Sequence, residues 1–148
     1  MVLDLDETLI HTSYSPIFGA EFKAKKGLFY LYERPHLKRF LDEYRARYNF
    51  AIWSASKSEY VRWIIKSTVL KEYEFDFIKT RKHCKRIYGK SGFLEYQKDL
   101  TPQLLQYQKI VMLDDLPKGV LPTSVVIKVS EFRGCPNDTE LLKVNILE

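Results

Sequence analysis

Short apolar runs recur along this chain and are separated by segments with a different periodicity. Residues 1–5, 50–53, 109–113 and 125–129 are predominantly apolar, which predicts short strands that are buried on both faces. A further strand is predicted over residues 75–78. Runs of this length are typical of the strands of a parallel sheet, and each of them should lie in the core.

Between these runs, apolar side chains repeat at helical spacing. Helices are predicted over residues 35–48, 57–68 and 101–107, and a closing helix is predicted to begin within residues 137–140. Three of them carry start signals, namely Pro35 at the first position, Ser56 with Glu59 as a capping box, and Thr101 before a proline.

Residues 21–32 alternate as in a β-hairpin, with Lys26 and Gly27 at its turn. Strands that alternate with helices indicate a parallel sheet covered by helices on both faces. We therefore expect a single α/β domain of Rossmann-like architecture over residues 1–148, with its ligand outside the carboxyl ends of the strands.

Polar side chains follow three of the predicted strands. Asp4 and Asp6 end the first, Ser54 ends the second, and Asp114 with Asp115 ends the fourth. If these strands are parallel neighbours, one rim of the sheet collects four carboxylates and a hydroxyl. Because such carboxylates would repel one another, a cation is implied, and Mg²⁺ suits one or two carboxylates together with water and a phosphate.

The same residues lie in four ordered motifs. The chain resembles the haloacid dehalogenase superfamily, and within it the small carboxy-terminal-domain phosphatases, the NLI-interacting-factor-like family. Similarity extends over nearly the whole chain, including Arg34-Pro35-His36 and the segment from Asp138 to Leu142. The motifs are Leu3-Asp4-Leu5-Asp6-Glu7-Thr8, Trp53-Ser54-Ala55-Ser56, Tyr96-Gln97-Lys98-Asp99-Leu100 and Met112-Leu113-Asp114-Asp115-Leu116-Pro117.

The resemblance implies a role for each residue. Asp4 would be the nucleophile that forms an aspartyl-phosphate, and Asp6 the general acid and base. Ser54 and Lys98 would hold the phosphoryl oxygens. Magnesium would be bound by the group Asp4, Asp6, Asp114 and Asp115, with Asp6 contributing its backbone carbonyl and Asp114 orienting either Lys98 or a metal-bound water. The residues expected to contact substrate or fix its loop are Thr8, Tyr14, Tyr60 and Arg81.

Two departures from the family pattern concern the metal and the substrate. Asp115 stands where the family usually has asparagine, which adds a negative charge at the metal site. Tyr14 and Lys57 stand where relatives place an aromatic and an apolar residue of a proline-accepting pocket. Recognition of a proline-containing polymerase tail therefore does not follow from the resemblance.

Charge and composition bear on the partners. The net charge of +5 favours anionic partners, and the basic side chains are densest over residues 79–86. Cys84 and Cys135 show neither disulfide nor zinc spacing. There is no apolar run of membrane-spanning length and no basic leader, so we expect a soluble intracellular protein that does not enter a membrane.

The segments where related enzymes insert a large cap are short here, which predicts an open site with only a hairpin insertion. An open site favours a phosphorylated protein as substrate. A polynucleotide 3′-end phosphatase that uses residues 79–86 on the backbone is the alternative. A non-catalytic phosphopeptide-binding module is a third interpretation, although binding alone needs no acid beside a nucleophile. Oligomeric state is not indicated.

Overall fold

The central element is a five-stranded parallel sheet. A computed structural model describes residues 1–117 and 125–146 of the chain. The strand order is β10-β9-β1-β5-β6, and every neighbouring pair is parallel. The parallel α/β sheet that the sequence predicted is therefore confirmed. The strands are β1 (Val2–Leu3), β5 (Phe50–Trp53), β6 (Phe75–Lys79), β9 (Val111–Asp114) and β10 (Val125–Lys128).

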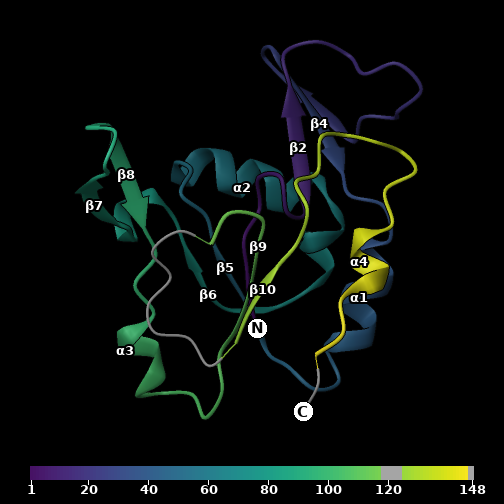
Figure 1. Ribbon diagram of the computed structural model, residues 1–148. Coiled ribbons are helices and arrows are strands. Elements are labelled where there is room, and N and C mark those ends of the chain that lie inside the picture. Colours follow the sequence, from purple (N-terminus) through teal and green to yellow (C-terminus); the bar gives the residue numbers. More distant parts are fainter. Residues whose placement is uncertain (118–124, 147–148) are drawn as a thin grey trace.

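Helices cover both faces of this sheet (Figure 1). One face packs against α1 (Leu37–Tyr44), α2 (Ser58–Ser67) and α4 (Glu140–Lys143), and the other packs against α3 (Thr101–Leu104). Successive residues of a strand alternate between the two cores. In β5, Ile52 joins the α1 and α2 side, whereas Trp53 joins the α3 side. This double burial explains why β1, β5 and β9 read as continuous apolar runs. The edge strands β6 and β10 are only partly buried.

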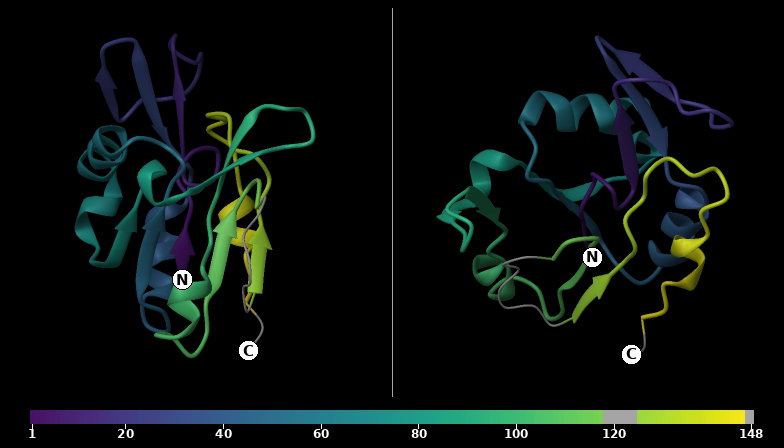
Figure 2. Two further views of the ribbon diagram at one scale, coloured as in Figure 1. Left: turned by 90° about the vertical axis from the view of Figure 1, so that its left-hand side faces the viewer. Right: turned by 45° about the horizontal axis from the view of Figure 1, so that its top comes forward.

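A small antiparallel sheet rises from the edge where the central strands end (Figures 1 and 2). Its strand order is β2-β4-β3. The strands are β2 (Ile10–Ser13), β3 (Ala24–Lys26) and β4 (Phe29–Glu33). The predicted turn is confirmed, because Gly27 lies between β3 and β4 with a φ of 58°, a conformation that glycine adopts without steric cost. Strand β2 was not predicted.

A second hairpin stands beside the sheet, in the basic segment that the sequence left unassigned. It consists of β7 (Lys85–Tyr88) and β8 (Leu94–Gln97) and follows the short helix η2 (Arg81–His83). A further short helix, η1 (Val69–Glu72), precedes β6. Within the described residues, the small β2-β4-β3 sheet and the β7–β8 hairpin are the only insertions beside the carboxyl ends of the central strands. The absence of a large cap agrees with the prediction.

Several predicted helix boundaries are wrong. Helix α1 begins at Leu37, so Pro35 is not its first residue. Helix α3 ends at Leu104 rather than at residue 107. Helix α1 ends at Tyr44 rather than at residue 48, and turns follow it. The capping box of Ser56 and Glu59 is absent, because Lys57 is the N-cap of α2 and makes no side-chain cap. The Ser56 hydroxyl instead donates to Asp6. Among the described residues, no helix combines the length and apolar character needed to cross a membrane.

Candidate active site

The carboxyl ends of β1, β5 and β9 meet at one rim of the sheet. Asp4 and Ser54 follow β1 and β5, and Asp114 is the last residue of β9. The Asp4 amide continues the ladder by donating to the Leu113 carbonyl at 3.0 Å. Because β1 pairs with both neighbours, the predicted convergence of these side chains is confirmed.

Lys98 reaches this rim from the end of β8. Its Nζ donates to Asp4 Oδ1 at 2.7 Å and to Asp114 Oδ2 at 2.8 Å, and all three side chains are buried. Burial lowers the pKa of Lys98, but the two carboxylates outweigh it and hold that pKa above its usual value. Burial raises the pKa of Asp4 to about 7, and Lys98 opposes the rise. The ammonium therefore favours an ionised Asp4.

Thr8 ties the loop after β1 to β9. Its Oγ1 lies 3.1 Å from Asp4 Oδ2 and 3.0 Å from Asp115 Oδ1, and it accepts the Asp115 amide at 3.0 Å. The amides of three successive residues, beginning with Thr8, donate to the Leu5 carbonyl, so the loop is tightly wound. Thr8 thus fixes two acidic side chains, Asp4 and Asp115, that lie far apart in the sequence.

Three carboxylates form a candidate cation site. Oxygen atoms of Asp4, Asp114 and Asp115 all lie within 4.8 Å of one another. Burial, followed by the nearby Asp114 charge, raises the pKa of Asp115, and the Thr8 hydrogen bond opposes the rise. A set of hard oxygen donors is the kind that Mg²⁺ prefers. The side chain of Asp6, which the sequence placed in the metal group, lies outside this cluster.

Asp6 is held by two hydroxyl groups, one from the loop before α2 and one from the first turn of α2. Ser56 Oγ donates to Asp6 Oδ2 at 2.9 Å, and the Tyr60 hydroxyl donates to Asp6 Oδ1. The Tyr60 oxygen also lies 3.0 Å from Thr12 Oγ1 on β2. Burial and the adjacent Asp6 raise the pKa of Tyr60, so this hydroxyl keeps its proton and remains a donor. Asp6 is thereby oriented by α2 and by the small sheet.

We expect Tyr60→Phe to lower kcat for an alkyl phosphate about tenfold with little change in KM, because one donor to Asp6 is lost. The loss should be smaller with p-nitrophenyl phosphate, which needs less protonation of its leaving group. Steady-state kinetics on the two substrates measure this. Tyr88→Phe is the matched control, since the Tyr88 side chain is exposed. An equal loss on both substrates would argue against a positioning role.

The other residues expected from the sequence occupy different positions around the rim. Ser54 is fully buried, and its Oγ accepts the Ser56 amide at 3.1 Å. The Arg81 Nε donates to the Ala55 carbonyl at 2.8 Å. Tyr14 is 72% exposed, and its ring centroid lies 5.2 Å from that of Phe29, which in turn contacts Tyr60. Tyr14, Phe29 and Tyr60 form an aromatic cluster.

An open cavity of about 420 Å³ contains the acidic residues. Its walls are Ala55, the β7–β8 hairpin and Leu116, and its lining includes Asp4, Asp6, Lys98, Asp114 and Asp115. A larger cavity of about 580 Å³ lies at the opposite ends of the strands and contains none of these residues. Chemistry therefore points to the smaller cavity as the active site.

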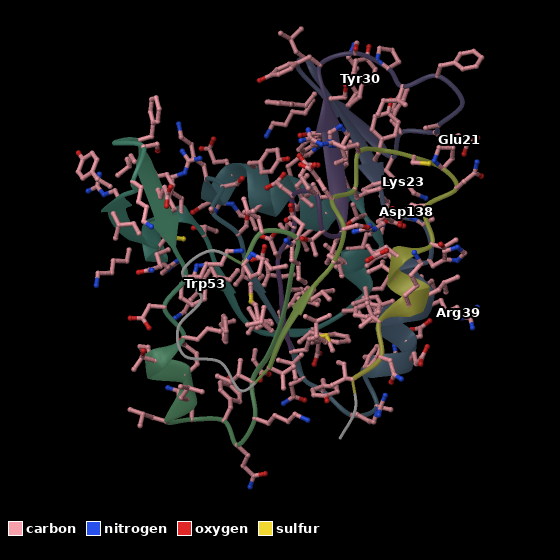
Figure 3. The ribbon with its side chains drawn as sticks, in the orientation of Figure 1. Glu21, Lys23, Tyr30, Arg39, Trp53 and Asp138 are labelled. Carbon is pink, nitrogen blue, oxygen red and sulfur yellow. The ribbon has the colours of Figure 1, made fainter. Side chains whose placement is uncertain are left out.

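Arg34 stabilises the loop that carries Thr8. No role was assigned to it from the sequence. It is fully buried, and its Nη1 donates to the Thr8 carbonyl at 2.9 Å. Its Nε and Nη2 donate to Asp138, at 2.8 and 3.0 Å, and Nη2 also donates to the Ser130 carbonyl. Asp138 lies just above α4 (Figure 3). Arg34 and Asp138 both lie in segments that resemble the family pattern. That resemblance is the sequence signal from which the ion pair could have been predicted.

A family comparison agrees with this geometry. The sequence model of the NLI interacting factor-like phosphatases matches residues 1–147. The chain belongs to this family. Its α/β fold, with a small hairpin insertion and no large cap, is accordingly that of the haloacid dehalogenase superfamily, as the motifs indicated.

Individual relatives match the chain at modest identity. The chain is 30% identical to CTD small phosphatase-like protein 3 of Caenorhabditis elegans, over 97% of this chain and 51% of the relative. It is 27% identical to the human CTD small phosphatase-like protein, over 96% of this chain and 52% of the relative. The chain thus spans about half the length of these relatives.

The fold resembles a solved structure described as Fcp1, an essential RNA polymerase II CTD phosphatase. The TM-score is 0.66 at 19% identity, and the match covers 94% of this chain and 43% of that one. At this identity the likeness concerns the fold alone.

Proposed function

We propose that residues 1–148 form a single phosphatase domain that hydrolyses phosphomonoesters through an aspartyl-phosphate on Asp4. The observation that carries the proposal is the contact of Lys98 with both Asp4 and Asp114, with Asp6 two residues from the nucleophile. A buried carboxylate whose ionised form is favoured by a neighbouring ammonium group can act as a nucleophile, and a second carboxyl at this spacing can supply a proton.

The reaction proceeds in two displacements. An Asp4 oxygen attacks phosphorus, the bond to the ester oxygen breaks, and Asp6 gives its proton to the departing alkoxide. Asp6, now ionised, then takes a proton from a water molecule that attacks the phosphorus. The acyl-phosphate bond breaks, inorganic phosphate leaves, and Asp4 returns as a carboxylate. Lys98 and Ser54 hold the equatorial phosphoryl oxygens, where negative charge spreads in the transition state.

The carboxylate cluster supports a magnesium requirement. Asp4 and Asp115 would hold the ion together with the Asp6 backbone carbonyl, while Asp114 is engaged with Lys98. Bound magnesium would neutralise part of the phosphate charge, so that one anion can approach another. The extra carboxyl of Asp115, where the family usually has an amide, should strengthen ion binding rather than change the chemistry.

A phosphorylated protein is the substrate class that we favour. Two relatives are named CTD small phosphatase-like proteins. The active-site cavity is open, so a bound substrate must itself shield the site from water, as a large phosphorylated protein can. The aromatic cluster of Tyr14, Phe29 and Tyr60 beside Asp6 offers apolar contacts for side chains that flank a phosphoresidue. A 3′-phosphorylated polynucleotide is the alternative, and its use should decline steeply with ionic strength.

A turnover panel tests this proposal. Phosphopeptides, a 3′-phosphorylated oligonucleotide and a sugar phosphate are compared at physiological salt with magnesium and with excess EDTA. We expect the highest kcat/KM for a phosphopeptide, loss of turnover in EDTA, and recovery when magnesium is added back. Full activity in EDTA would contradict the metal assignment, and a preference for the oligonucleotide would favour the alternative substrate.

The acid role of Asp6 predicts a dependence on the leaving group. Asp6→Asn should lower turnover of an alkyl phosphate roughly 10²-fold or more, because the amide cannot donate the proton that the alkoxide needs. The loss with p-nitrophenyl phosphate should be smaller. Equal losses on the two substrates, measured under the same conditions, would show that Asp6 acts in some other way.

A further inference from the structure

A third cavity, of about 490 Å³, opens beside the active site and is lined mainly by basic side chains. Lys57 lies at the start of α2, Arg81 and Lys82 lie in η2, and Arg86 lies on β7. The lining is completed by Ser58, Cys84 and Tyr96. We call it the basic pocket. Segments far apart in the sequence thus bring four cationic side chains to one concave surface.

The positive charge of the basic pocket is not neutralised within the described part of the chain. No acidic side chain lines the pocket. Among the described residues, no carboxylate forms an ion pair with Lys57, Lys82 or Arg86. Cations that converge without a counter-ion repel one another, and a bound anion would relieve that repulsion. The pocket therefore favours an anionic occupant.

Arg81 is already held in place by contacts within the protein. Its Nε donates to the Ala55 carbonyl at 2.8 Å, its backbone amide donates to the Ser56 carbonyl, and its guanidinium carbon lies 4.9 Å from the centre of the Tyr96 ring. No described residue accepts a hydrogen bond from its two Nη groups. A planar guanidinium held in this way can form paired hydrogen bonds to phosphate oxygens with little further loss of entropy.

The basic pocket adjoins the cavity of the active site. Tyr96 lines both, and Ala55, which accepts the Arg81 hydrogen bond, lines the active-site cavity. The two cavities differ in charge, because the active site contains the acidic cluster whereas its neighbour is basic. One ligand can therefore place a phosphate at the catalytic centre and a second anionic group in the basic pocket.

We propose that the basic pocket binds a second phosphate on the same polypeptide segment, so that the preferred substrate is doubly phosphorylated. This inference rests on the proposed phosphatase function. A nucleic-acid strand, which carries a phosphate at every nucleotide, would call for a continuous row of cations. Here the basic side chains gather in one pocket, and the remaining walls of the active-site cavity include the apolar Ile87, Leu94 and Leu116. A peptide with two phosphates fits this distribution better.

Peptide binding to the Asp4→Asn protein tests the proposal without requiring turnover. Fluorescence anisotropy compares a singly phosphorylated peptide with peptides that carry a second phosphoserine at successive positions on either side, and with peptides that carry glutamate there. At physiological salt we expect at least one doubly phosphorylated peptide to bind about tenfold more tightly than the singly phosphorylated one. The paired variant Lys82→Ala with Arg86→Ala should reduce this ratio of Kd values to near one.

The exposed pair Lys66→Ala with Lys71→Ala removes the same charge elsewhere and should leave the ratio as it is. Circular dichroism verifies that each variant is folded. Equal Kd values for singly and doubly phosphorylated peptides would overturn the proposal. So would tighter binding of a 3′-phosphorylated oligonucleotide that the Lys82 and Arg86 substitutions abolish, because it would assign the pocket to a nucleic acid. Failure of phosphatase activity alone would refute the proposed function but not this binding preference.

Discussion

Asp4→Asn should leave the protein folded and abolish turnover, with less than about one per cent of the activity remaining. The amide retains the size of the side chain and can still contact Lys98 and Thr8, but it is a far poorer nucleophile than a carboxylate. Hydrolysis of p-nitrophenyl phosphate measures the loss, and thermal unfolding measures the fold.

The matched control is Asp42→Asn, a change at an exposed aspartate on α1. This control should retain full activity. Substantial turnover by the Asp4→Asn protein would assign the nucleophile elsewhere. If the Asp4→Asn protein unfolds, its loss of activity says nothing about the mechanism. Asp4→Glu, which keeps the charge but shifts the carboxylate oxygens, then separates an effect on catalysis from an effect on folding.

Lys98→Met should have the second largest effect, and it should alter both activity and stability. Turnover is expected to fall roughly 10³-fold, because an equatorial phosphoryl oxygen loses its cationic partner. In EDTA the free energy of unfolding should also fall by about 3 kcal/mol or more, because Asp4 and Asp114 are left buried without the ammonium between them. Urea denaturation at neutral pH measures this difference.

A second substitution separates the electrostatic cause from simple loss of packing. Adding Asp114→Asn to Lys98→Met removes one of the two uncompensated carboxylates and should recover part of the lost stability, but none of the activity. Lys66→Met, at an exposed position on α2, serves as the control and should change neither. If the double variant is less stable than Lys98→Met alone, the repulsion between Asp4 and Asp114 is not the cause.

The sequence predicted the central sheet because its three inner strands, β1, β5 and β9, are buried on both faces and helical segments lie between the strands. The apolar run Phe50–Trp53 contributes to both cores, so its pattern is continuous and easily recognised. Strand β2 was missed because Ile10–Ser13 has one fully buried residue and three partly exposed ones, which gives no clear period. The β7–β8 hairpin was missed for a related reason, since none of its strand residues is buried.

The site residues that directly follow a strand could be predicted from the sequence. Asp4, Ser54 and Asp114 converge because parallel neighbouring strands end at the same edge. The contacts of Asp6 could not be foreseen, because Ser56 resembled a helix cap and Tyr60 resembled an apolar wall residue. Long-range packing of α2 against the loop after β1 decides both orientations. Arg34 and Asp138, 104 positions apart, likewise meet only in the folded chain.

Detection of the covalent intermediate tests the central claim most directly. The protein is mixed with a phosphopeptide and magnesium, quenched in acid within the first turnover, digested and examined by mass spectrometry. We predict one added phosphoryl group on the peptide that contains Asp4, removable by hydroxylamine and absent from the Asp4→Asn protein. Rapid phosphate release with no phosphoryl group on Asp4 at any quench time, or with the group on another residue, would contradict the account.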